Sequence, residues 1–300
     1  MYGGFWYNLK NAFNHKDNGL YKLLAINILV YLLLMVSRVF LTLGGGEEIY
    51  RGILSYLMMP ASIPYFATQP WSIFTYMFLH EGFFHILFNM LFLYWYGLLD
   101  NEYMGSRKVV NLYILGGLTG GLFYLLIYNI APYFRDQLDS ALMLGASAGV
   151  YAIVVGAATL APNTSFHLIL LGPVKIKYIA IFYVLVAFAN SSGANAGGEL
   201  AHLGGAALGF LYILQLQKGR DLGSPIQAVG GFFENIFSKK PKVKVTYRKP
   251  SGDYPPTDNK RKTDVSTQEE IDKILDKIAE KGYDNLTKEE KRKLFDFSNK

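Results

Sequence analysis

The sequence contains no cysteine, so neither disulfide bonds nor thiolate-ligated metal sites are possible. Charge is scarce as well: 17% of the residues are charged, and most of the chain between Lys22 and Lys218 carries almost none. The N-terminal segment lacks the small-residue cleavage site of a secretory signal, so its first apolar run is expected to be retained. In contrast, 51% of the residues are hydrophobic, which is high for a soluble protein and indicates a membrane protein.

Long apolar runs predict the fold class. A helix needs about 20 apolar residues to cross a bilayer. Six runs are predicted to be membrane spans, with 178–190 as the core of the fifth: 23–43, 83–99, 109–131, 141–161, 178–190 and 199–216. The connection 44–80 is too apolar for a free loop and too interrupted by proline for a span, so we expect it to lie in the membrane interface. We therefore predict an all-α polytopic membrane protein, a bundle of six transmembrane helices.

Lysine and arginine distribution predicts the orientation. In the six-span arrangement one side of the membrane receives nearly all basic residues: Lys10, Lys16, Lys22, Arg107, Lys108, Lys175, Lys177, Lys218 and Arg220. Only Arg51 and Arg135 fall on the other side. Because basic loops stay in the cytoplasm, we expect a multi-pass protein of the cell (inner) membrane with both termini cytoplasmic.

The composition changes after residue 220. We predict a membrane core over 1–220, a basic linker over 221–265 and a short helical cytoplasmic tail over 266–300. Thr267 with Glu270, and Thr287 with Glu290, have the spacing of capping boxes at two helix starts. About half of the net charge of +6 comes from this region, and it indicates contact with anionic lipid rather than nucleic acid. Otherwise the charge pattern is that of a solvated tail without chemistry.

A few polar residues lie inside the predicted spans. Ser147 lies near the start of the fourth span, with Tyr151 four residues later on the same helix face. His85 and Asn89 likewise share a face of the second span, and His202 lies in the sixth. Serine in membrane helices commonly serves close packing, and histidine can simply bond a neighbouring helix. Ionisable groups at this depth are nevertheless candidates for function.

Glycine spacing indicates how two of these residues could meet. Gly198, Gly205 and Gly209 share a helix face with His202 and would allow near backbone-to-backbone contact with another helix. If that helix is the fourth, His202 comes within hydrogen-bonding reach of Ser147. A base beside a hydroxyl is the arrangement of an activated nucleophile.

The remaining polar residues could complete an acyl-transfer site. The oxyanion formed by attack on a carbonyl requires donors already in place. His85, Asn89 and the backbone N–H of Ser147 could supply them.

Two competing motifs fit less well. The segment GASAG matches the nucleophile elbow of soluble hydrolases, but that motif follows a strand and needs an acid between serine and histidine. No acidic residue lies between Ser147 and Glu199, so we predict a Ser–His dyad. His80, Glu81 and His85 form HExxxH, whose extra residue turns the second histidine off the face that a zinc site requires. We expect no metal and no cofactor.

Four segments, in order, carry a family resemblance: PW, HEGFFHILFN, GASAGVYA and AHLGGAALG, within about residues 20–217. Together they resemble the rhomboid family of intramembrane serine proteases. The resemblance implies a six-helix core that cleaves single-pass transmembrane substrates near the outer membrane face. It implies that Ser147 is the nucleophile and His202 the general base and then acid. It further implies that His85 and Asn89 belong to the oxyanion hole and that Tyr151 packs on the imidazole.

The chain departs from the family pattern at two positions. Ala148 follows the serine where glycine is common, and Ser72 follows Trp71 where the family has an arginine that anchors the first loop. The main alternative is a catalytically inactive rhomboid-like protein that binds membrane proteins, although such proteins typically lack the serine or the histidine. A small-solute transporter would be expected to show internal repeats or paired broken helices, and neither is evident.

Overall fold

The computed structural model describes residues 4–15, 17–168, 170–228, 270–280 and 282–298. The chain divides into two compact units, residues 1–239 and 240–300. Most of the predicted basic linker, from 229 to 265, lies outside the described residues, as does Thr267.

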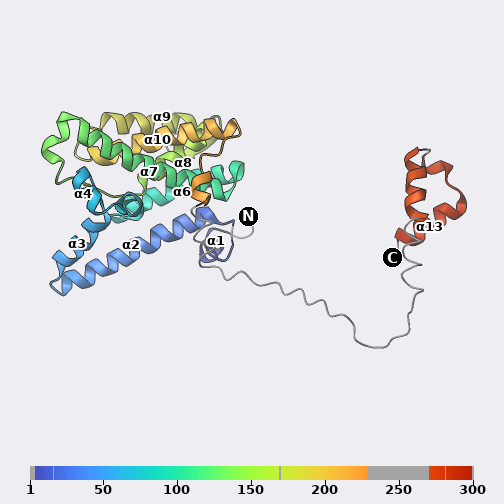
Figure 1. Ribbon diagram of the computed structural model, residues 1–300, viewed down its shortest axis with the longest axis horizontal. Helices are drawn as coiled ribbons and strands as arrows, with labels where there is room; N and C mark the ends of the chain where they lie inside the picture. Colours follow the sequence, from blue (N-terminus) through green and yellow to red (C-terminus); the bar gives the residue numbers. More distant parts are fainter. Residues whose placement is uncertain (1–3, 16, 169, 229–269, 281, 299–300) are drawn as a thin grey trace. The chain divides into compact units, whose positions relative to one another are not determined.

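The first unit is a helical bundle (Figure 1). Its helices include α1 (Phe5–Lys10), α2 (Gly19–Leu43), α3 (Glu47–Leu57), α4 (Ile63–Thr68), α5 (Ser72–Thr75), α6 (Phe83–Met104), α7 (Ser106–Ile130), α8 (Ser147–Leu160), α9 (Ile176–Ala189) and α10 (Ala196–Gln217), with 3-10 turns η1 (Tyr76–Phe78) and η2 (Pro132–Gln137). Its strands are β1 (Met59–Pro60), β2 (Leu142–Met143), β3 (Ser165–Leu168) and β4 (Gly172–Lys175).

Four helices, α2, α6, α7 and α10, are long and apolar enough to cross a membrane. The other two predicted spans are also apolar helices, but α8 and α9 have only 14 residues each. At 1.5 Å per residue each measures about 21 Å, against roughly 30 Å for the hydrocarbon core. A helix of this length that reaches one surface of the hydrocarbon core would have its other end inside the membrane.

Two predictions about the fold were wrong in detail. The unit is mostly helical rather than all-α, because β1 pairs antiparallel with β2, and β3 with β4. The fourth predicted span, α8, does not begin at residue 141: it begins at Ser147. The preceding residues are extended because Leu142 and Met143 pair with the first loop (residues 44–80), and Gly145 then turns the chain with φ +136°.

One predicted boundary also differs. The second predicted span, α6, does not stop at residue 99 but continues to Met104, where Gly105, with φ +81°, ends it. After α8, strands β3 and β4 form a hairpin that turns the chain back.

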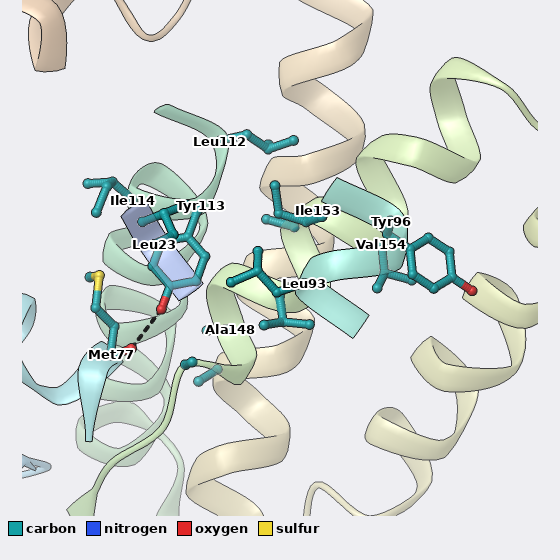
Figure 2. Packing of buried hydrophobic residues seen from close by; sticks show 14 of the residues in the cluster. Leu23, Met77, Leu93, Tyr96, Leu112, Tyr113, Ile114, Ala148, Ile153 and Val154 are labelled. Carbon is teal, nitrogen blue, oxygen red and sulfur yellow. Dashed lines mark hydrogen bonds between the residues drawn. The ribbon is translucent and has the colours of Figure 1, made fainter. Parts of the chain in front are cut away.

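The connection 44–80 is an ordered part of the bundle. The hydroxyl of Tyr76 donates to the carbonyl of Gly117 at 2.6 Å, and the amide of Asn129 donates to the carbonyl of Ala61 at 2.7 Å. Figure 2 shows a third link, from the hydroxyl of Tyr113 to the carbonyl of Met77, at 2.8 Å. Helix α7 therefore holds this loop by three side-chain hydrogen bonds.

The first loop is held together without the arginine that the family resemblance implies after Trp71. The indole N–H of Trp71 donates to the carbonyl of Tyr56 at 3.0 Å, and the two rings lie 4.6 Å apart. Ser72 is fully buried beside them. A small residue at position 72 thus fits a loop that is anchored through Trp71.

Glycines bring α7, α8 and α10 into close contact. A Cβ atom on Gly205 would overlap the carbonyl oxygen of Ala148, and one on Gly209 would overlap that of Ala152. On the other side, a Cβ on Gly120 of α7 would lie 2.6 Å from both the Ala148 side chain and the carbonyl oxygen of Ala201. Gly205 and Gly209 of the predicted stripe on α10 therefore pack against α8, as expected for close membrane-helix contacts, whereas the atoms nearest a Cβ on Gly198 belong to Asn195.

We predict that Gly205→Ala destabilises the bundle by about 1–3 kcal/mol, because the added methyl overpacks the contact with α8. Thermal unfolding in detergent measures this. Gly52→Ala is the matched control, since nothing lies within 4 Å of a Cβ there. Equal unfolding temperatures for the two variants would contradict the packing argument.

The second unit contains a helix over 270–280, η3 (Tyr283–Asn285) and α13 (Lys288–Ser298). Ile271, Ile274 and Leu286 form its small core. The predicted capping box at its second helix is confirmed: the N–H of Thr287 donates to Glu290 at 2.7 Å, and the N–H of Glu290 donates to the Thr287 hydroxyl at 3.3 Å.

Glu290 also ties the two helices of this unit together. Hydrogen bonds from Lys277, with that from the backbone of Thr287, lower the pKa of Glu290 to about 2. A carboxylate with a lowered pKa stabilises the fold above its ordinary pKa and loses that contribution as the pH falls through the lowered value.

We therefore predict that the tail loosens as the pH falls from about 4.3 toward about 2. Backbone chemical shifts of 288–298 in the labelled protein should move toward random-coil values over that interval. Glu290→Gln should show the loosened state already at neutral pH, with Glu280→Gln as the control. Unchanged shifts in Glu290→Gln would refute this role.

Candidate active site

Ser147 is the first residue of α8, and the first loop fixes its approach. The N–H of Gly145 donates to the carbonyl of Tyr76 at 3.0 Å, just beyond the pairing of β2 with β1. Because φ of Gly145 is +136°, a side chain there would be strained. The turn before Ser147 is thus held by the first loop, which α7 holds in turn.

His202 reaches Ser147 from α10. Its Nε2 lies 2.7 Å from the Ser147 Oγ, although the residues are 55 positions apart in the chain. The phenol ring of Tyr151 stacks on the imidazole with ring centres 4.2 Å apart and planes 8° apart. The structure therefore brings together three side chains that were predicted from the sequence to share one site.

Glu199 is a further partner of His202 that was not predicted from the sequence. Its Oε2 lies 3.0 Å from the imidazole Nδ1, and both side chains are largely shielded from solvent. The prediction of a dyad rested on the absence of acids between Ser147 and Glu199, and it gave Glu199 itself no role. The usable signal was the three-residue spacing to His202, which places both on one helix face.

His85 and Asn89 face the same space as Ser147. Asn89 donates one amide proton to the carbonyl of His85 at 2.9 Å, which orients its side chain, and a second amide proton remains. A Cβ on Gly145 would lie 3.1 Å from the His85 Nε2 and 3.5 Å from the Ser147 Oγ. Glycine at this position therefore keeps the region between the imidazole and the hydroxyl open.

A cavity of about 1060 Å³ adjoins this cluster. Polar lining groups include Ser147, His202, His85 and Asn89, and aromatic lining groups include Tyr124 and Tyr183. Glu81 also lines it, whereas His80 is buried with its ring centre 5.1 Å from that of His85. Among the described residues, no three histidine or acidic side chains are grouped as metal ligands.

This arrangement can activate a hydroxyl. An imidazole that accepts a hydrogen bond from a serine can take its proton as the oxygen attacks. The first N–H groups of a helix have no acceptor within the helix and carry partial positive charge, which favours negative charge beside Ser147. The side chains of His85 and Asn89 line the same cavity and can also donate hydrogen bonds there.

We predict that a fluorophosphonate probe modifies Ser147, which peptide mass spectrometry would locate. His202→Ala should slow the labelling by roughly 100-fold or more, the usual contribution of a general base. Gly145→Ala should also slow it, because its methyl group would enter the space beside the His85 Nε2. Ser165→Ala, on the exposed hairpin, serves as control; labelling that persists in Ser147→Ala would show that another residue reacts.

The chain is similar to known proteins over the region that contains this site. Residues 67–218 match the rhomboid domain, and residues 259–300 match a family of unknown function, DUF6576. The chain is 30% identical over 146 residues to "RHOMBOID-like protein 12, mitochondrial" of Arabidopsis thaliana, a match covering 45% of this chain and 43% of that protein. It is 29% identical over 154 residues to "Rhomboid-like protein 16, chloroplastic" of the same plant, covering 48% of each.

A further relative is "Rhomboid protein 1, mitochondrial" of Saccharomyces cerevisiae, 26% identical over 224 residues. That match covers 73% of this chain and 60% of the yeast protein, so the chain spans less than two thirds of each of these relatives. The rhomboid-domain match includes Ser147, His202, His85 and Asn89. The chain belongs to the rhomboid family.

Proposed function

We propose that the protein is an intramembrane serine endopeptidase that hydrolyses peptide bonds of single-pass transmembrane proteins. The observation that supports this most directly is the 2.7 Å contact between the Ser147 Oγ and the His202 Nε2 beside an open cavity. Family membership adds that the matched region is a rhomboid domain.

The proposed reaction follows the usual steps of acyl transfer. The Ser147 Oγ attacks the substrate carbonyl while its proton moves to the His202 Nε2. The carbonyl oxygen becomes an oxyanion, bonded by the Ser147 N–H and the side chains of His85 and Asn89. The C–N bond then breaks as His202 gives its proton to the leaving amine, and water releases the acyl group by the same steps in reverse.

The departure at position 148 is compatible with this chemistry. Ala148 is 1% exposed, and its side chain and carbonyl face the glycines of α7 and α10. Its methyl group therefore belongs to the helix contact and not to the cavity surface.

The basic loops support the proposed orientation. The N–H of Gly19 donates to the hydroxyl of Ser106, and the ring of Phe166 lies 4.8 Å from that of Tyr96. The start of α2, the α6–α7 junction and the β3–β4 hairpin thus gather at one end of the bundle. Lys22, Arg107 and Lys175 lie in these segments, so we propose that this end faces the cytoplasm and both termini lie there.

The position of Ser147 supports a cut near the opposite face. It begins a helix of about 21 Å whose other end leads into the basic hairpin. A serine at that height lies inside the outer part of a bilayer of roughly 30 Å. A helical substrate hides its carbonyls, so we expect substrates with helix-breaking residues near the cut.

We propose that the membrane is the cell membrane. The names of the relatives refer instead to mitochondria and chloroplasts.

The test is cleavage of a single-pass substrate by the purified full-length protein in detergent. Wild type and Ser165→Ala should cleave it, and Ser147→Ala and His202→Ala should not. Asn89→Ala should lose about 100-fold to 1000-fold in kcat, the usual effect of removing one oxyanion donor. Cleavage by Ser147→Ala would overturn the proposal, and substrate binding without cleavage by wild type would favour the catalytically inactive rhomboid-like alternative.

A further inference from the structure

We propose that Glu199 is a positioning residue that turns the serine–histidine pair into a three-membered Ser147–His202–Glu199 unit. This inference rests on the proposed function, and it adds a side chain that the proposed acyl-transfer steps do not use. Glu199 is not among the residues that line the cavity, whereas His202 is, so Glu199 would act through His202 and not on the substrate.

The geometry places His202 between two oxygens. Its Nε2 lies 2.7 Å from the Ser147 Oγ, and its Nδ1 lies 3.0 Å from the Glu199 Oε2. A carboxylate only accepts hydrogen bonds, so the proton of a neutral imidazole must be on Nδ1. The Nε2 lone pair then faces the serine hydroxyl, which is the tautomer needed to take its proton.

The surroundings of Glu199 strengthen its contact with His202. It lies in the first turn of α10, where the helix dipole stabilises negative charge. The side chains of His202 and Glu199 are only 12% and 16% exposed, so solvent screens their interaction little. When His202 accepts the serine proton, the imidazolium therefore forms beside a carboxylate that bonds it directly.

The other groups around His202 cannot replace Glu199. Tyr151 from α8 stacks on the flat face of the ring, which fixes the ring plane but does not distinguish the two nitrogens. His85 from α6 and Ser147 lie on the cavity side, the latter beside Nε2. Among the described residues Glu199 is the one side chain that contacts Nδ1.

The first measurement is kinetic, on the full-length protein with a transmembrane substrate. Glu199→Gln should lower kcat by roughly 10-fold to 100-fold, as expected for losing a bond to a charged group or a supporting carboxylate. KM should change little, because Glu199 does not line the cavity. Glu199→Asp, which keeps the charge on a shorter arm, should retain more activity than Glu199→Gln.

Glu102→Gln is the matched control, since Glu102 is an exposed glutamate near the end of α6. A kcat for Glu199→Gln within about twofold of wild type would overturn the inference while leaving the proposed function intact. A rise in KM with unchanged kcat would also overturn it, because that pattern belongs to substrate binding.

The second measurement does not require activity. The chain has five histidines, so ¹⁵N NMR of the histidine-labelled protein is tractable, and loss of a signal in His202→Ala assigns His202. Wild type and Glu102→Gln should show His202 protonated at Nδ1 when neutral, and Glu199→Gln should show a mixture of tautomers. If the wild type cleaves nothing yet shows this pattern, the proposed function fails and the positioning contact stands. A mixture of tautomers in the wild type would overturn the inference.

Discussion

The structure depends on the close approach of α10 to α8. Gly205 and Gly209 lie against the backbone of Ala148 and Ala152, where any side chain would overlap a carbonyl oxygen. In lipid, apolar side chains gain little from association, so small residues that permit close contact determine which helices pair. One turn from this contact, Ser147 and His202 face each other, and a wider separation of the two helices would break their hydrogen bond.

The first loop contributes the second constraint, the direction from which the chain enters α8. Strand β1 pairs with β2, and the carbonyl of Tyr76 accepts a hydrogen bond from Gly145. The side chain of Tyr76 bonds α7 in the same region, so one residue links the loop, the helix and the turn before the serine. An element that looked like a membrane-surface connection thus belongs to the support of the site. Proline and glycine interrupt it because the backbone changes direction several times between its short helices.

The proposed active site combines features of a dyad and of a triad. The acid in a soluble nucleophile-elbow hydrolase lies between the serine and the histidine in the chain, whereas Glu199 precedes His202 by three residues on the same helix. Because one helix carries both groups, their contact needs no additional element of the fold. The surrounding bundle also shields this contact from solvent. The bond between the Glu199 carboxylate and the His202 imidazole is therefore stronger than that of an exposed ion pair.

The sequence by itself determined the six apolar helices, the membrane setting and the identity of the polar residues within them, because length, hydropathy and helical spacing are local properties. It also predicted a close helix contact for α10, since Gly205 and Gly209 recur on the face of His202, but it left the partner helix open. The start of α8 at Ser147, the strands before and after it, and the order of the first loop were decided by tertiary structure. They depend on hydrogen bonds between residues far apart in the chain, such as Gly145 with Tyr76, which no local pattern records. The pairing of Glu199 with His202 lies between these cases: the spacing permits it, but only the fold turns the Nδ1 side of the ring toward the carboxylate and the Nε2 side toward the serine.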